Sequence, residues 1–377
     1  MKKKITFFVL HLGYGGIETS VINTVNSLID YFDIEIVSFY NLEKNQVNMI
    51  DKKVKIKYLY EGEPNKKEFI KSVKRFNVVK AFKEGKKSLD IINKKKHLVA
   101  DAIKNSKSDY LISTRMEFNI LLSEYGSDKC IKIAQEHCYH NHNKKYLSTI
   151  KDKYNNIDYL LALTKTLEND YKEVLKGNTI TKTKVVTIPN MLYEIPKEVS
   201  NLNSKNLITV GRLDTLKRND DIIRAFSKID NKDYTLTIIG DGKEEDNLKN
   251  LTSELNIEDR VIFTGYKTKE EIKNYMLNSN IFLMASETEG LPMVLLEALS
   301  YGLPCIVYDI ENGVRDIIED SYNGFIIKNR NEEEYVNRIN QLLSNESELK
   351  QFGKNARESI NNFTKEEVVK KWLDILK

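Results

Sequence analysis

The sequence predicts an α/β protein with two Rossmann-like domains, each built on a doubly wound parallel sheet. Short apolar runs alternate with helical patterns along the chain, and this rhythm calls for parallel strands covered by helices on both faces. The rhythm stops between Pro189 and Lys205, a segment that holds two of the five prolines with several Asn and Ser, and then restarts. A length of 377 residues allows two or three domains, each with its own core.

The predicted strands divide into two series. The first series is Ile5 to Leu12, Ile34 to Phe39, Val54 to Tyr58, Tyr110 to Ser113, Lys132 to Gln135, Tyr159 to Leu163 and Val185 to Ile188. The second is Leu207 to Val210, Leu236 to Ile239, Val261 to Phe263, Ile281 to Met284, Cys305 to Tyr308 and Gly324 to Ile327. We therefore expect a first domain over residues 1–190 and a second over 191–362. Two final helices, Leu349 to Asn362 and Thr364 to Leu376, exceed the needs of the second sheet.

One strand-to-helix turn in the second half has the features of an anion site. The apolar run 281–285 enters the turn as a buried strand would, and Pro292 is expected as the first helical residue. The N–H groups of Gly290 and Leu291 would then point outward. Free amides at a helix N-terminus, with the positive end of the helix dipole behind them, suit a phosphate.

Two glutamates flank this turn, Glu289 before it and Glu297 about two turns along the helix. Carboxylates near an anion site suit a ligand in which a phosphate is flanked by hydroxyl-bearing sugars, such as a nucleotide sugar. The plain alternative is a solvated helix face, which is the usual fate of exposed Glu pairs.

A second loop supplies cations. Arg212 and Lys217 follow the predicted strand Leu207 to Val210, at the edge where open parallel sheets bind ligands. Two cations at this position could hold a diphosphate.

Together these residues resemble the retaining glycosyltransferases of glycosyltransferase family 4, which have the two-domain GT-B fold. The matching pieces are Gly211-Arg212 with Lys217, the Glu289 to Glu297 pair with Gly290-Leu291-Pro292, and Gly15-Gly16-Ile17-Glu18 before the helix Ile17 to Leu28. The resemblance covers the C-terminal half nearly throughout and the N-terminal half at a few motifs.

The resemblance implies an acceptor-binding first domain and a nucleotide-sugar-binding second domain that face a central cleft. In this fold the last helix crosses back onto the first domain, which here assigns residues 363–377 to it, with Trp372 as an anchor. It also implies retention of anomeric configuration by front-face attack, with the departing phosphate oxygen taking the acceptor proton.

The resemblance also assigns roles to residues. Arg212 and Lys217 would stabilise charge on the leaving nucleoside diphosphate, since fixed cations in a closed site act strongly on a transition state. Glu289 would hold hydroxyls of the transferred sugar, Glu297 the ribose, and His137 would face the donor sugar. Further donor-binding candidates are Gly15, Gly16, Asn190, Gly240, Gly265, Tyr266, Gly290 and Leu291.

Structural readings stay open for several of these residues. Gly15 and Gly16 also fit an ordinary tight turn, Asn190 a turn asparagine, and Gly265 with Tyr266 a plain turn. His137 could be merely structural.

Metal and cofactor signals are weak. The run Gln135 to His142 contains three of the five histidines, but the rest of the sequence has no second cluster at ligand spacing and no Asp-x-Asp. We therefore expect a metal-independent enzyme without cofactors. His140 and His142 could face the acceptor, but nothing in the sequence establishes this role. The third glycine of a dinucleotide fingerprint is replaced by Glu18, which argues against NAD.

Charge and cysteine usage bear on location. The net charge is only +4, but lysines crowd the segment from Lys66 to Lys96. Its apolar residues recur at helical spacing: Phe69, Ile70, Val73, Phe76, Val79 and Phe82. This amphipathic helix either rests on an anionic membrane surface or packs its apolar stripe into the core, and both readings stay open.

Cys130, Cys138 and Cys305 indicate a reduced compartment rather than a disulfide framework. Lys2 to Lys4 precede only eight mostly apolar residues, which is too short for a signal peptide, and no run could span a bilayer. We expect a cytoplasmic protein, peripheral at most on the inner face of the membrane, with no nucleic-acid partner. Abundant Lys, Asn and Ile suggest an AT-rich bacterial genome.

The expected activity is that of a bacterial hexosyltransferase. It would move a hexose or N-acetylhexosamine from a UDP-sugar to a lipid-linked glycan acceptor in capsule, exopolysaccharide or teichoic-acid assembly. UDP in preference to GDP or ADP follows from the resemblance alone. The alternatives are an NAD-dependent nucleotide-sugar epimerase or dehydrogenase, and a non-catalytic nucleotide-sugar-binding module.

Overall fold

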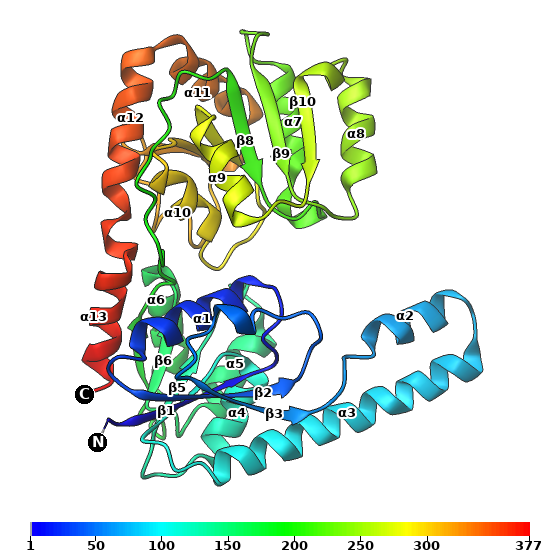
Figure 1. The fold of residues 1–377 in the computed structure, drawn as a ribbon, viewed down its shortest axis with the longest axis vertical. Helices are drawn as coiled ribbons and strands as arrows, with labels where there is room; N and C mark the ends of the chain where they lie inside the picture. The colour runs from blue at the N-terminus through cyan, green and yellow to red at the C-terminus, as the bar shows by residue number, and fades with distance from the viewer. Residues whose placement is uncertain (1) are drawn as a thin grey trace. The chain divides into compact units, whose positions relative to one another are not determined.

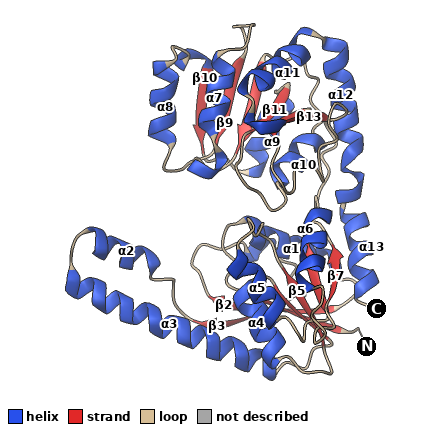
Figure 2. Ribbon diagram, turned by 180° about the vertical axis from the view of Figure 1, so that it is seen from behind, coloured by secondary structure: helices blue, strands red, loops and turns tan. Residues whose placement is uncertain are grey.

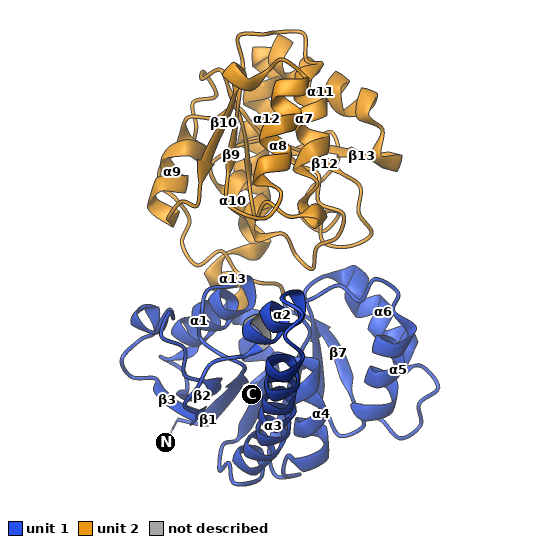
Figure 3. Cartoon of the chain, turned by 90° about the vertical axis from the view of Figure 1, so that its right-hand side faces the viewer, with its two compact units in different colours: residues 1–188, 369–377 blue, residues 189–368 orange. Residues whose placement is uncertain are grey.

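The computed structural model describes residues 2–377, with the side chains of residues 66 and 67 outside this description. The chain divides into two compact units, coloured separately in Figure 3. Unit 1 consists of Met1–Ile188 and Val369–Lys377, and unit 2 of Pro189–Val368. The boundaries predicted from the sequence were residues 190 and 362.

Unit 1 contains a seven-stranded parallel sheet in the order β3-β2-β1-β4-β5-β6-β7 (Figure 1). The strands are β1 (Lys4–Val9), β2 (Asp33–Tyr40), β3 (Lys55–Tyr60), β4 (Tyr110–Ser113), β5 (Ile131–Gln135), β6 (Tyr159–Ala162) and β7 (Lys184–Thr187). Successive residues such as Phe7 and Phe8 are both buried, because helices cover both faces of the sheet. The helices of unit 1 are α1 (Gly16–Leu28), α2 (Lys66–Lys74), α3 (Val78–Lys104), α4 (Met116–Tyr125), α5 (Lys144–Lys153) and α6 (Lys165–Leu175), and a 3₁₀ turn, η1, spans Val47–Met49.

Unit 2 contains a six-stranded parallel sheet in the order β10-β9-β8-β11-β12-β13. Its strands are β8 (Asn206–Val210), β9 (Thr235–Ile239), β10 (Val261–Gly265), β11 (Ile281–Met284), β12 (Cys305–Tyr308) and β13 (Gly324–Ile327). Its helices are α7 (Asn219–Ser227), α8 (Glu245–Glu254), α9 (Lys269–Leu277), α10 (Met293–Ser300), α11 (Glu332–Ser344) and α12 (Glu346–Ser359). Short 3₁₀ turns are η2 (Thr215–Lys217), η3 (Glu258–Arg260), η4 (Lys328–Arg330) and η5 (Ile360–Phe363). In Figure 2 the strands of each unit lie between layers of helices, so the predicted pair of Rossmann-like domains is confirmed.

The strand order of each sheet reverses once. In unit 1 the chain runs outward from β1 through β2 to β3 and then returns to β4 on the other side of β1. In unit 2 the same reversal occurs at β8, whose neighbours are β9 and β11. Loops that leave two adjacent strands in opposite directions open a crevice at the carboxyl edge of the sheet, which is where such folds bind ligands.

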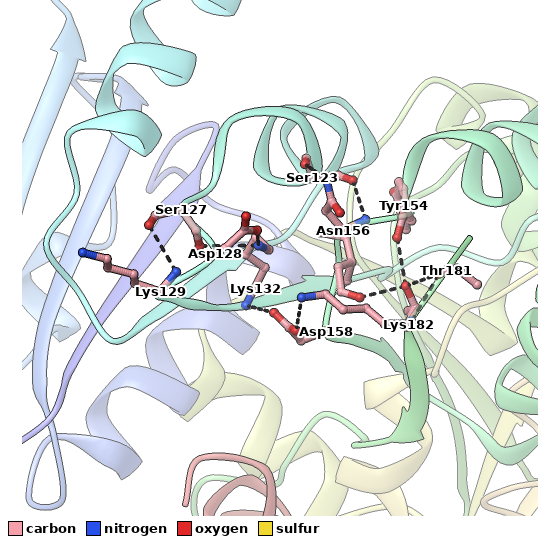
Figure 4. Close-up of polar contacts among 12 residues, drawn as sticks. Ser123, Ser127, Asp128, Lys129, Lys132, Tyr154, Asn156, Asp158, Thr181 and Lys182 are labelled. Carbon is pink, nitrogen blue, oxygen red and sulfur yellow. Dashed lines mark hydrogen bonds and ion pairs between the residues drawn. The ribbon is translucent and has the colours of Figure 1, made fainter. Parts of the chain in front are cut away.

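Charged groups join the amino ends of β5 to β7, at the opposite edge of the sheet in unit 1 (Figure 4). The Asp158 carboxylate accepts the Lys132 N–H at 2.8 Å and pairs with the Lys182 ammonium at 2.9 Å. The Lys132 side chain is fully buried, yet its ammonium reaches Asp128 at 3.2 Å. A buried lysine needs such a partner, so this edge is a structural feature of the sheet.

The C-terminal helix α13 (Lys365–Ile375) connects the units. Its last residues belong to unit 1, where Trp372 is buried and the Tyr110 hydroxyl donates to the Leu376 carbonyl at 2.7 Å. Residues 369–377 thus return to the first unit, as the resemblance implied for the last helix.

The lysine-rich segment forms two helices rather than one. The chain breaks at Arg75–Asn77, where Phe76 has a φ of 50°, and α2 then packs against the first half of α3. Among the described residues, no helix is both long and apolar enough to cross a bilayer.

Candidate functional site

The two predicted site loops of unit 2 lie side by side. One follows β8 and the other follows β11, and these strands are neighbours. A backbone hydrogen bond of 2.8 Å from Glu287 N–H to the Leu216 carbonyl joins the loops. The loops come together because both strands end at the same edge of a parallel sheet, at the point where the strand order reverses.

The Lys217 ammonium and the Glu289 carboxylate form an ion pair of 2.5 Å across these loops. The two side chains are 25% and 16% exposed, so the pair is well shielded. Asp214 caps the turn that presents Lys217 by accepting its backbone N–H. Arg212 differs in that its side chain is 75% exposed and pairs with Asp214 at 3.0 Å.

The amides of the turn after β11 are available, as expected. Among the described residues, none accepts a hydrogen bond from the N–H of Gly290 or Leu291. The prediction for Pro292 was wrong by one position: α10 begins at Met293, and Pro292 is its N-cap with extended backbone angles. Proline is compatible with this conformation, because its ring fixes φ and leaves ψ free.

Glu297 is half-buried on α10, and its carboxylate makes no hydrogen bond or ion pair with any described residue. Burial raises the pKa of its carboxyl, and the charge of Lys269 opposes this shift. A partly desolvated carboxylate without a partner is costly to the fold, and this cost is typical of a group kept to bind a ligand.

The glycine candidates of unit 2 meet at the same edge. Gly240 has a φ of 138°, and a Cβ there would lie 1.9 Å from the Gly211 carbonyl, so only glycine fits. Its N–H donates to the Gly265 carbonyl at 3.0 Å. Tyr266, which follows, is 67% exposed.

Asn312 holds the Glu289 loop in place and was not predicted from the sequence. It is buried and donates to the carbonyls of Glu289 and Gly290. The adjacent Gly313 has a φ of 84°, and a Cβ there would lie 2.7 Å from the Gly290 carbonyl. An Asn-Gly turn signal was visible in the sequence, but its contact with this loop was not.

Arg330, also not predicted, supports the loop from its other end. Its guanidinium donates to the Ala285 carbonyl at 2.8 Å, pairs with Asp221 and lies 4.5 Å from the Tyr308 ring centroid. Asp221 in turn pairs with Arg218 at 2.9 Å, beside the Lys217 turn. No sequence signal could have identified this set, because its members come from elements that are far apart in the sequence.

In unit 1, His137 follows β5 at the carboxyl edge. Both of its ring nitrogens are shielded from solvent and have no hydrogen-bond partner among the described residues. Burial lowers the pKa of His137 to about 4, with a further contribution from Arg115. An imidazole in this state is neutral at pH 7 and is able to accept or donate a hydrogen bond.

The preceding residue, Glu136, anchors this segment. Its buried carboxylate accepts hydrogen bonds from Asn119 at 2.9 Å and from the hydroxyls of Tyr146 and Tyr154. Burial raises the pKa of Glu136, and these three hydrogen bonds oppose the shift.

The glycine loop after β1 contains a carboxylate. A Cβ on Gly15 would lie 2.2 Å from Glu18, so this carboxylate folds back over Gly15, while the space around Gly16 is open. Glu18 lies 3.4 Å from His11, and burial lowers the pKa of His11. Arg115 also acts on His11; its position after β4 was a sequence signal that pointed to this edge and was overlooked.

The remaining candidates have structural partners. His140 is buried and bonded to Asp170 at 3.0 Å, and its other ring nitrogen accepts the His142 N–H. Asn190 lies three residues after the end of β7, in the first residues of unit 2. Within residues 2–377, no group of three or more His, Cys, Asp or Glu side chains could hold a metal ion.

Comparisons with known proteins give a consistent result. Residues 193–359 match the family model of the group 1 glycosyl transferases. Over 383 residues the chain is 29% identical to an "uncharacterized glycosyltransferase" of Haemophilus influenzae, with 99% of this chain and 100% of the relative covered. It is 24% identical over 387 residues to a Campylobacter jejuni α-1,4-N-acetylgalactosaminyltransferase named for a diphospho-undecaprenol-linked glycan, with 99% and 98% covered.

Two solved structures share the whole architecture. The lipopolysaccharide outer core galactosyltransferase WaaB superposes with a TM-score of 0.75 at 22% identity over 99% of each chain. A TarM mutant of Staphylococcus aureus in complex with α-GlcNAc-glycerol and UDP gives a TM-score of 0.75 at 19% identity over 100% of each chain. The GT-B fold is thus confirmed, and the findings together support a group 1 glycosyltransferase of the bacterial surface-glycan type.

Replacement of Glu297 by Gln should affect ligand binding and the stability of the fold in opposite directions. Because the folded state raises the pKa of this carboxyl, ionisation costs stability as the pH rises through the pKa of the unfolded chain. At neutral pH, Glu297→Gln should therefore leave the Tm equal or higher. If Glu297 holds the ribose of UDP, as the resemblance implies, the variant should also reduce the Tm increase expected with UDP. Thermal unfolding with and without UDP measures both effects, and Glu270→Gln on α9 is the control. A normal UDP shift in Glu297→Gln would contradict the ribose role.

Proposed function

We propose that this chain is a retaining hexosyltransferase of glycosyltransferase family 4. It takes a hexose or N-acetylhexosamine from a UDP-sugar and transfers it to a lipid-linked glycan during assembly of a capsule, exopolysaccharide, teichoic acid or related surface glycan. The observation that carries the proposal is the set of groups at one edge of unit 2: the Lys217–Glu289 pair, the free amides of Gly290 and Leu291, and the unpartnered Glu297.

Each of these groups suits one part of a UDP-sugar. The amides and the Lys217 ammonium take the diphosphate, Glu297 the ribose hydroxyls and Glu289 hydroxyls of the transferred sugar. An ammonium has three donors, so Lys217 is able to keep Glu289 while it binds a phosphate oxygen. In this position it also screens the carboxylate from the phosphate. Arg212, exposed before binding, adds a second cation.

The proposed step requires no covalent intermediate on the protein. The bond between the sugar C1 and the diphosphate oxygen breaks with both electrons leaving on oxygen, and the acceptor oxygen bonds to C1 on the same face. The departing oxygen takes the acceptor proton. Lys217 and Arg212 stabilise the charge that develops on the diphosphate.

The names of two similar proteins support the donor and the acceptor. The TarM structure contains UDP, and the name of the Campylobacter jejuni transferase includes a diphospho-undecaprenol carrier. The NAD-dependent alternative is less favoured, because the Glu18 carboxylate covers Gly15 at the position where a dinucleotide phosphate would approach. We also propose a cytoplasmic location, since Cys130, Cys138 and Cys305 are free thiols.

A thermal-shift screen tests the donor. UDP and one UDP-sugar should raise the Tm because they bind only the native state, whereas GDP, ADP and NAD should have little effect. A shift with NAD alone would favour an oxidoreductase.

Lys217→Ala tests the diphosphate grip. Loss of a cation aimed at the leaving group should lower the rate of UDP release at least about a hundredfold. The measurement is the release of UDP from the UDP-sugar that the thermal-shift screen selects, with a lipid extract as the acceptor. The double variant Lys217→Ala/Glu289→Gln avoids an orphaned carboxylate, and Lys205→Ala, in an exposed ion pair with Asp233 of the same unit, is the control. Wild-type turnover in Lys217→Ala would remove this assignment.

The same assay tests metal independence. Activity should survive EDTA, since the sequence has no Asp-x-Asp to hold a metal between phosphates. Complete loss that Mn²⁺ restores would instead point to an overlooked ligand set, with His137 to His142 examined first.

A further inference from the structure

The hairpin formed by α2 and the first half of α3, residues 66–96, is a distinctive surface of unit 1. Figure 1 shows α2 folded back along the distal half of α3, away from the sheet. The second half of α3 packs on α4 and on the sheet. The hairpin is therefore anchored at one end only.

The tip of the hairpin is apolar and open to solvent. Phe76 is 91% exposed, Val78 78%, Val79 82% and Phe82 78%. Phe76 also has a left-handed backbone with a φ of 50°, a conformation that bulky side chains rarely adopt. Neither the side chain nor the backbone of Phe76 benefits the isolated fold. An exposed apolar cluster of this kind marks an interaction surface.

The seam between the two helices leaves more apolar surface uncovered. Asn65 joins the helices by donating to the Glu84 carbonyl at 2.9 Å and accepting from the Ser88 hydroxyl at 2.9 Å. Phe69 packs beside Gly85, where a Cβ would lie 3.5 Å from the Phe69 ring, an ordinary contact distance. Even so, Ile70, Val73, Leu89 and Ile92 remain 42–63% exposed. The hairpin is thus held together by polar contacts and a narrow seam.

The hairpin is also strongly cationic. Residues 66–96 contain twelve Lys and Arg against three Asp and Glu, a net charge of +9. The whole chain carries +4, so the remaining residues together carry −5. The positive charge of the protein is therefore concentrated on this one projection.

We propose that the hairpin docks unit 1 on an anionic lipid surface. The tip residues Phe76 to Phe82 enter the headgroup region, and the lysines of both helices lie against lipid phosphates. Apolar residues surrounded by lysines are typical of interfacial helices, and each cation near an anionic membrane adds to the attraction. A second copy of the hairpin fits less well because its equal charge repels, and a nucleic acid offers no apolar partner for Val78 and Val79.

Vesicle sedimentation of the full chain tests the proposal. The protein should sediment with phosphatidylcholine vesicles that contain phosphatidylglycerol, should stay in solution with phosphatidylcholine alone, and should be released by salt. Phe76→Ser/Phe82→Ser should weaken partition at least about tenfold, since two large side chains lose their apolar environment. Both residues are exposed, so the fold should tolerate the change. Ile180→Ser, also exposed but outside the hairpin, should bind like wild type.

Further variants test the contribution of charge and the insertion of the tip one at a time. Lys83→Gln/Lys87→Gln should weaken binding, whereas Lys151→Gln/Lys153→Gln, which removes equal charge elsewhere in unit 1, should not. Trp372 is the single tryptophan and is buried, so Phe82→Trp adds an exposed reporter whose emission should shift to the blue on vesicles.

Two results would overturn the proposal. One is wild-type vesicle binding by Phe76→Ser/Phe82→Ser with no blue shift from Phe82→Trp. The other has two parts: the wild-type protein does not bind the vesicles, and Phe76→Ser/Phe82→Ser lowers the molecular mass measured by sedimentation equilibrium. This result would mean that a second copy covers the tip.

Discussion

The reversal of strand order is the constraint on which the candidate site depends. Every strand of a sheet is parallel to its neighbours, so all connections that leave the carboxyl edge compete for the same space. In unit 2 the loops after β8 and β11 turn away from each other, and this divergence makes room for a ligand. Lys217 and Glu289 are 72 residues apart in sequence and yet in contact, because the sheet brings them to this position.

Rigid support keeps the two loops in place. Asn312 holds the carbonyls of Glu289 and Gly290, and Arg330 holds the carbonyl of Ala285, just after β11. Asp221 links Arg330 to Arg218, so both loops share one network. Side chains fixed in this way need little reorganisation when a ligand arrives, which lowers the entropic cost of binding.

Patterns local in sequence were predictable, and contacts between distant segments were not. Each strand was found from a short apolar run, and the loops that carry Lys217 and Glu289 were found from the ends of those runs. Their direct ion pair was not foreseen, because each side chain had been assigned to a different part of the donor. Asn312 and Arg330 act on carbonyls of other loops, a role that depends on register within the folded sheet. The break at Phe76 escaped notice because neither Gly nor Pro marks it.

The division of the chain has a consequence for biosynthesis. A ribosome makes Val369–Lys377 after the whole of unit 2, yet these residues complete unit 1. Domains usually fold in the order in which they are made, but here unit 1 becomes complete only after unit 2 has been made. Premature termination near the C-terminus would thus harm the N-terminal unit, and spare the neighbouring one.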